Sequence, residues 1–166
     1  MTYRLHRRTI VPGELSNVFA FFRNPQNLEA ITPPWLGFRI VSRSDTSVRE
    51  GTRIRYRLRI AGIPMAWESR ITEYCDCSHF ADEQVTGPYE RWYHRHTFRA
   101  VPGGVEMTDD VEYTLPFGPI GRVVHWLAVR HQLRAIFDHR TKVITERFGA
   151  VAPAAITPGE PVELRA

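Results

Sequence analysis

Two histidines stand two residues apart in the segment WYHRHTF, at His94 and His96. In a β-strand, side chains two residues apart point to the same face, so Trp92 and Phe98 would share that face. Two imidazoles facing a pocket can orient a carbonyl group or transfer a proton. The spacing therefore makes the two histidines candidates for ligand binding or acid–base catalysis.

The same spacing can supply two metal ligands, and Asp82 or Asp109 could approach from neighbouring strands. No third ligand is evident in the sequence itself, so we expect no bound metal and no other cofactor. A structural alternative stays open, in which both histidines are hydrogen-bonded core residues beside Asp82, Asp109 or Asp110.

A carboxylate also falls on the expected inward face. Asp82 and Gln84 alternate with Phe80, and burying a carboxylate without a partner is costly. Arg140 and the two histidines are the candidate partners. A β-bulge would reverse this assignment, because it would turn Asp82 outward and Glu83 inward.

Aromatic residues could form the apolar part of a cavity. Trp67, Trp92, Tyr56 and Tyr113 suit flat or lipid-like ligands, and simple core packing is the alternative for each. The segment from Trp35 to Phe38 follows two prolines, where it could gate a cavity mouth or pack against the first helix.

Several classes of function find little support. The sequence has no G-x-S-x-G elbow, and Cys75 and Cys77 are too close together for an unstrained disulfide and lack a second pair for zinc. The net charge is +4, but no nucleic-acid-binding motif is present. No signal peptide or bilayer-spanning segment is apparent either, so we expect a cytoplasmic protein without a membrane span.

The elements that must position these residues follow from periodicity. A first strand over about residues 3–11 precedes a short amphipathic helix over residues 14–22 and a second short helix over residues 26–31. An antiparallel meander comes next, with its clearest alternation over residues 52–60, where four arginines oppose four apolar side chains. This order predicts an α+β fold with a curved sheet of six to seven strands.

A helical pattern then runs from the PFGP segment to about Phe148. Leu133, Phe137, Arg140 and Ile144 fall on one stripe, and Arg140 interrupts its apolar character. Arg140 either clamps a buried acid or reaches an acidic group of a ligand. We expect one domain over residues 1–149 and a proline-rich tail over residues 150–166 that is disordered or loosely docked.

Five segments carry a family resemblance: NPQNLEAITPPWLGFRI, GIPMAWESRITEY, FADEQVTGPYERWYHRHTF, TDDVEYTLPFGPIG and IFDHR. In this order they resemble a bacterial subgroup of the SRPBCC (START/Bet v 1-like) superfamily that is described as polyketide-cyclase-like. The resemblance covers about residues 3 to 148. It implies the helix-grip fold, with a deep cavity between sheet and C-terminal helix and usually no metal or organic cofactor.

The sequence and the resemblance predict that the chain binds a small hydrophobic or aromatic molecule, with a homodimer left open. The candidate binding residues are Tyr56, Trp67, Asp82, Gln84, Trp92, His94, His96, Tyr113 and Arg140. The alternative is a cyclase, aromatase or dehydratase, in which His94 or His96 removes a proton and Arg140 or Tyr113 stabilises the enolate. A third hypothesis is that an acidic partner docks on the sheet face that carries Arg53, Arg55, Arg57 and Arg59. The alternative is that these arginines only face solvent.

Overall fold

The structure is a computed structural model that describes residues 1–150 and the backbone of residues 163–165. Its elements are, in chain order, β1 (Thr2–Val11), α1 (Leu15–Phe22), α2 (Gln26–Ala30), η1 (Pro34–Leu36), β2 (Arg39–Arg43), β3 (Arg53–Ile60), β4 (Ile63–Cys75), β5 (His79–Thr86), β6 (Arg91–Val101), β7 (Gly104–Thr114), α3 (Gly118–Val124), η2 (His125–Val129), α4 (Arg130–Phe148) and β8 (Glu163–Arg165). The predicted order of elements is confirmed.

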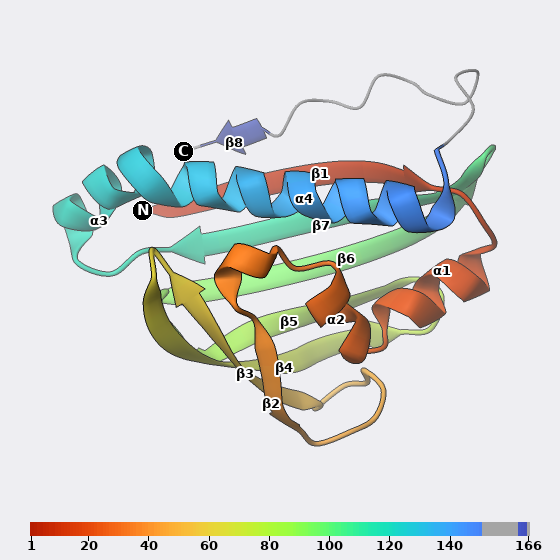
Figure 1. Cartoon of the computed structure of the whole chain (residues 1–166), viewed down its shortest axis with the longest axis horizontal. Helices are drawn as coiled ribbons and strands as arrows, with labels where there is room; N and C mark the ends of the chain where they lie inside the picture. Colours follow the sequence, from red (N-terminus) through yellow and green to blue (C-terminus); the bar gives the residue numbers. More distant parts are fainter. Residues whose placement is uncertain (151–162, 166) are drawn as a thin grey trace.

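The strands form one antiparallel sheet in the order β2-β3-β4-β5-β6-β7-β1-β8. Strands β1 to β7 form the predicted sheet, and α4 lies across its concave face in the helix-grip arrangement (Figure 1). Within the predicted tail, which we expect to be disordered or loosely docked, Glu163–Arg165 pairs with β1 as an eighth strand. Residues 151–162 and 166 lie outside the described residues.

Strand β3 shows how the alternation works. Ile54 and Leu58 are buried, whereas the intervening arginines are exposed. Glu68 on β4 accepts hydrogen bonds from two of them, Arg53 at 2.7 Å and Arg55 at 2.6 Å. These contacts support the interpretation of a solvated outer face.

The long helix buries its predicted stripe of Leu133, Phe137, Arg140 and Ile144 against the sheet. Its N-terminal part differs from the uninterrupted α-helix that we expected. The α3 helix begins after Phe117, which has a left-handed backbone conformation (φ 69°), and a π-helical turn, η2, connects α3 to α4. No helix of the described residues is long and apolar enough to cross a membrane.

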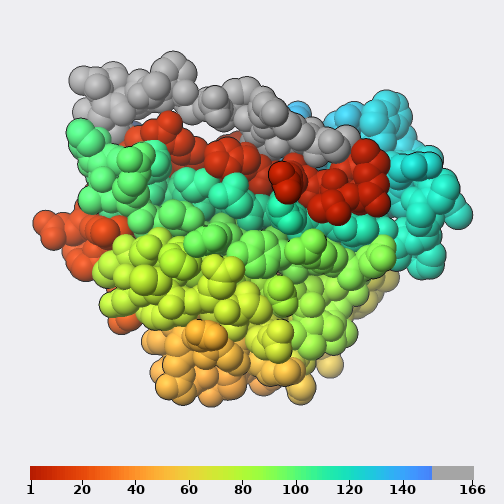
Figure 2. Space-filling view, turned by 180° about the vertical axis from the view of Figure 1, so that it is seen from behind, coloured from red at the N-terminus to blue at the C-terminus, as the bar shows by residue number. Residues whose placement is uncertain are grey.

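Two hydrophobic clusters support the fold. One lies beneath α1 and includes Phe19, Phe80 and Phe98, and the other lies beneath the first half of α4 and includes Trp67 and Trp92. At the free edge of the sheet, β2 is five residues long and has a register shift between Ile40 and Ser42. Figure 2 shows the opposite side of the molecule, where α3 and η2 project beyond the sheet.

Candidate functional site

A cavity of about 210 Å³ lies between the concave face of the sheet and α4, and α1, α2 and η1 contribute to its wall. Its lining is mainly apolar and aromatic. The polar residues of the lining are Asn27, Thr32, Ser69, Asp82, His94, His96, Gln132 and Arg140. The cavity therefore lies between the two core clusters, and only a few polar side chains line it.

A buried polar cluster forms one part of this wall, and Asp109 is its centre. One oxygen of Asp109, Oδ1, lies 2.7 Å from His96 Nδ1, 3.0 Å from His94 Nε2 and 3.3 Å from Arg140 Nη1. All four side chains are buried. The pairing of β6 with β7 sets His96 opposite Asp109, and the inward stripe of α4 supplies Arg140.

The charge states of this cluster follow from its surroundings. Burial opposes ionisation of Asp109, but Arg140 and the hydrogen bonds from both histidines hold the pKa of Asp109 well below its ordinary value. Burial, together with the neighbouring His94, lowers the pKa of His96 to about 3. Near neutral pH, Asp109 is therefore a carboxylate paired with Arg140, and His96 is uncharged.

A second polar chain reaches the cavity through Ser69. Ser69 Oγ donates a hydrogen bond to Asp82 Oδ2 at 3.0 Å and accepts one from Trp67 Nε1 at 3.1 Å. The Tyr56 hydroxyl lies 3.1 Å from the same oxygen. Burial raises the pKa of Asp82, which favours its neutral form relative to an exposed aspartate.

Asp82 faces the cavity even though a bulge lies beside it. The register of β4 against β5 shifts between Ile71 and Glu73, opposite Asp82, and this bulge is on β4 rather than β5. Glu83 accordingly points away, 3.7 Å from Arg70. The inward placement of Asp82 predicted from alternation is therefore retained.

Aromatic rings form another part of the wall. Tyr56 stacks on Trp67 with ring centroids 5.8 Å apart, and Trp92 meets Trp67 edge to face at 5.3 Å. Tyr89 packs on Trp92 at 4.8 Å. Such a surface suits a flat apolar ligand, because both ring faces and ring edges are available for contact.

Asp82, His94 and His96 each offer one ligand atom, and these atoms lie within 4.8 Å of one another. Each histidine also contacts Asp109 through a ring nitrogen, and a carboxylate partner of this kind is common for metal-bound histidines. The charge of the neighbouring Asp109 is already offset by Arg140 and therefore adds no net attraction for a cation. The group is therefore a weaker candidate for a metal than for a neutral hydrogen-bonding ligand.

Seven of the nine predicted binding residues line the cavity, and Gln84 and Tyr113 do not. The Gln84 side chain instead contacts the backbone of Tyr89, donating to its carbonyl at 2.7 Å and accepting from its amide at 3.2 Å. The Tyr113 hydroxyl lies 2.8 Å from His125 Nε2, and Tyr3 stacks on that imidazole at 3.5 Å. Both predicted placements were wrong because a turn and η2, respectively, provide partners from other parts of the chain.

Three residues that are central to the polar cluster, the Ser69 chain and the aromatic wall were not among the predicted binding residues. Asp109 and Ser69 fall on the inward sets of their strands, so alternation gave a signal for both. Tyr89 lies in the turn between β5 and β6, where no periodicity exists to reveal its direction. Near the cavity, Trp35 is 56% exposed, whereas the neighbouring Leu36 is buried.

Comparison with known proteins agrees with this geometry. The family model described as "Polyketide cyclase / dehydrase and lipid transport" matches residues 11–137. The chain belongs to this family. No curated protein matches the sequence.

Solved structures with the same fold come from bacteria and plants. The protein TTHA0849 from Thermus thermophilus has a TM-score of 0.64 and 18% identity, over 89% of this chain and 97% of that one. The ginseng major latex-like protein 151 from Panax ginseng has a TM-score of 0.62 and 13% identity, over 90% and 99% of the two chains. A norcoclaurine synthase from Thalictrum, a point mutant with a transition-state analogue, has a TM-score of 0.63 and 13% identity, over 89% and 96%. At these identities the likeness concerns the fold alone.

Proposed function

We propose that this member of the family binds a neutral, flat ligand of about one or two rings that carries a carbonyl or hydroxyl group. The observation that carries the proposal is an apolar cavity whose polar groups are buried and paired with one another. The cavity of about 210 Å³ is somewhat larger than the roughly 150 Å³ that accommodates benzene in an engineered protein. This size limits the ligand to a small molecule.

The charges support a neutral ligand. Arg140 and Asp109 offset each other, so neither has a free charge to offer a ligand. Asp82, with its raised pKa, and the two histidines remain as hydrogen-bonding groups beside the aromatic wall. A carbonyl or hydroxyl oxygen could exchange hydrogen bonds with them, whereas an anionic ligand would lose its hydration without gaining a countercharge.

The test begins with native mass spectrometry of the purified protein and denaturing extraction of any bound compound. The binding affinity of that compound, or of a panel of one-ring and two-ring aromatic ketones, is then measured by calorimetry. Ile136→Trp fills the cavity and should weaken binding at least about tenfold, since an added indole overlaps the ligand volume. Ala135→Trp, at an exposed position on the same helix, is the matched control.

Unchanged affinity in Ile136→Trp would place the ligand elsewhere. A protein that carries no compound and gains no thermal stability from the panel would indicate a packed core instead of a binding cavity. Either result would contradict the proposal.

A second candidate function is acid–base catalysis of the cyclase or dehydratase kind. The observation that favours it is the contrast between two nearby aspartates, because the pKa of Asp82 is raised and that of Asp109 is lowered. Such contrasts separate an acid from a permanently charged group in enzyme sites. In this hypothesis His94, oriented by Asp109, takes the substrate proton, and Asp82 donates one; Arg140 is a positioning residue.

Under this hypothesis His94→Gln should lower turnover of a polyketone substrate by about 10²- to 10⁴-fold. Binding should change little, because glutamine keeps a hydrogen-bonding group of similar length. Equal loss of turnover and affinity would instead mean that His94 serves binding alone.

A further inference from the structure

The most unusual surface of the molecule lies outside the cavity, on α3 and η2. Among the described residues, six of the eleven exposed large hydrophobic side chains fall between residues 117 and 127. Phe117 is 79% exposed, Trp126 60% and Leu127 61%. Soluble monomers seldom expose so many large apolar groups together, so this patch indicates an interaction surface.

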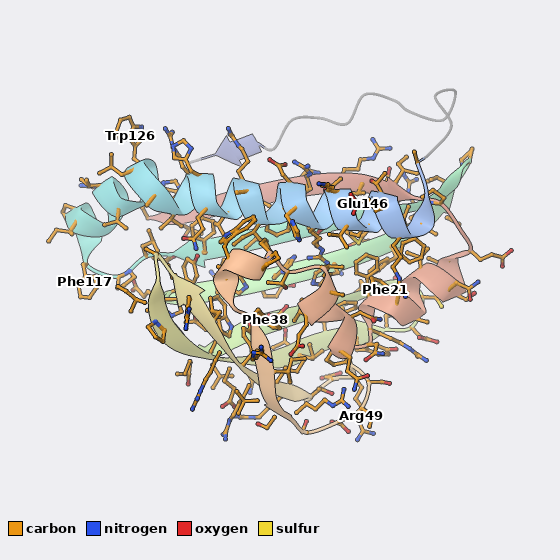
Figure 3. All side chains as sticks on the ribbon, viewed as in Figure 1. Phe21, Phe38, Arg49, Phe117, Trp126 and Glu146 are labelled. Atoms are coloured by element: carbon orange, nitrogen blue, oxygen red, sulfur yellow. The ribbon has the colours of Figure 1, made fainter. Side chains whose placement is uncertain are left out.

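The patch is presented by a firmly attached piece of backbone. Buried His125 anchors η2 through Tyr113 and Tyr3, while its neighbours Trp126 and Leu127 face outward. Phe117 is held in a left-handed conformation with its ring almost entirely in solvent. Such a conformation is uncommon for a bulky residue, and it is found where the surrounding structure requires it. Figure 3 shows Phe117 and Trp126 at the outer end of the molecule.

The segment that forms the patch carries only basic charge, although Glu90, from the turn before β6, lines a surface pocket together with Arg122. From Tyr113 to Phe137 the sequence contains no aspartate or glutamate, but it contains Arg122, Arg130 and Arg134. Within the described residues none of these arginines is in an ion pair, and Arg130 lies over the Trp126 ring at 5.2 Å. Aromatic and aliphatic side chains beside unpaired arginines are typical of helices that lie in the interface of anionic bilayers.

The cavity extends to the end of the molecule that carries the patch. Gln132 and Leu133, in the first turn of α4, line the cavity, as does Ile60 at the end of β3. The β3–β4 turn lies at the same end as α3 (Figure 1), and Ile63, the first residue of β4, is 63% exposed beside it. A second copy of the chain fits the patch less well, because a two-fold contact through it would bring like charges together.

We propose that α3 and η2 form a docking surface for the anionic phospholipid bilayer. Phe117, Trp126 and Leu127 enter the headgroup boundary, and Arg122, Arg130 and Arg134 contact the phosphates. Docking sets the cavity at the membrane surface, but it does not depend on which ligand the cavity takes.

The test is flotation of the full chain with two kinds of vesicle, phosphatidylcholine alone and an equal mixture of phosphatidylcholine and phosphatidylglycerol. The protein should bind the anionic vesicles much more strongly. Replacing both Trp126→Ser and Leu127→Ser should weaken that binding by at least about tenfold, since apolar area is lost. Arg122→Gln should weaken it about fivefold, the usual effect of one basic residue near such a surface.

Val41→Ser is the matched control, because Val41 is 57% exposed on β2 and outside the patch. All the replaced side chains are exposed, and near-ultraviolet circular dichroism checks that each variant is folded. Equal binding to both vesicles, no binding to either, or full binding by the Trp126→Ser, Leu127→Ser variant would overturn the proposal. A dimer in sedimentation that this variant dissociates, without vesicle binding, would assign the patch to a second copy and would also overturn it.

Discussion

Asp109 shows how a single carboxylate oxygen can organise a site. Its Oδ1 contacts His94, His96 and Arg140 and thereby joins β6, β7 and α4 at the cavity wall. A buried ion pair need not add net stability, because the desolvation of both charges offsets their attraction. Its clearer consequence is orientation, because one ring nitrogen of each histidine is fixed against Asp109 while both side chains line the cavity.

The low pKa of His96 has a consequence for stability. The folded-state pKa is about 3 against 6.5 for the free side chain, so the unfolded chain binds a proton that the folded chain does not over that range. The free energy of unfolding should therefore decrease as pH falls from about 6.5 towards 3, with a slope of up to about 1.4 kcal/mol per pH unit.

Asp82 acts in the opposite sense, because its raised pKa lets the folded chain take up a proton first. The useful measurement is thus the difference in urea unfolding free energy between the wild type and His96→Gln at several pH values. The wild type should lose more stability on acidification. Parallel pH dependence of the two proteins would mean that the pKa of His96 is the same in the folded and the unfolded chain.

At the scale of elements, η2 is held to the sheet by one polar contact and one stack. His125 Nε2 meets the Tyr113 hydroxyl, and its ring lies on Tyr3. The π-helical turn brings His125 inward while the residues on either side of it stay exposed. This short segment therefore connects the long helix and the outermost helix to the sheet.

His125→Phe should destabilise the fold by about 1–3 kcal/mol, because the Tyr113 hydroxyl would be left buried without a partner. Adding Tyr113→Phe should recover part of the loss, since the orphaned hydroxyl is removed. Chemical denaturation of both variants tests this, with His131→Phe, at an exposed position nearby, as the control. Additive losses in the double variant would show that the two side chains do not interact.

At the scale of the whole molecule, periodicity predicted the sheet, the buried stripe of α4 and seven of the nine cavity positions. It could do so because burial on one face imposes a period of two on strands and about 3.6 on helices. Gln84 and Tyr113 were misplaced because their partners, Tyr89 and His125, come from a turn and a π-helical segment. Contacts of that kind depend on the three-dimensional path of the chain, which the alternation of residues within one strand does not predict.

The cavity is lined by residues between Phe21 and Arg140. A chain shortened to residues 1–149 loses β8, which pairs with β1 over three residues at the sheet edge. We therefore predict that it folds and binds the ligand of the full chain with an affinity within about twofold, because a three-residue edge strand contributes little. Calorimetry of both lengths is the check, and a large loss of affinity would mean that the C-terminal segment belongs to the binding domain.

The other edge of the sheet bears on how the protein behaves in concentrated solution. Strand β2 is short, its register shifts between Ile40 and Ser42, and it begins and ends with an arginine. A strand of this kind is a poor template for a further strand, because the bulge interrupts the ladder and approaching edges would repel each other. Hydrogen-bonded growth of the sheet from one molecule to the next is thus discouraged at β2, even where molecules are crowded together.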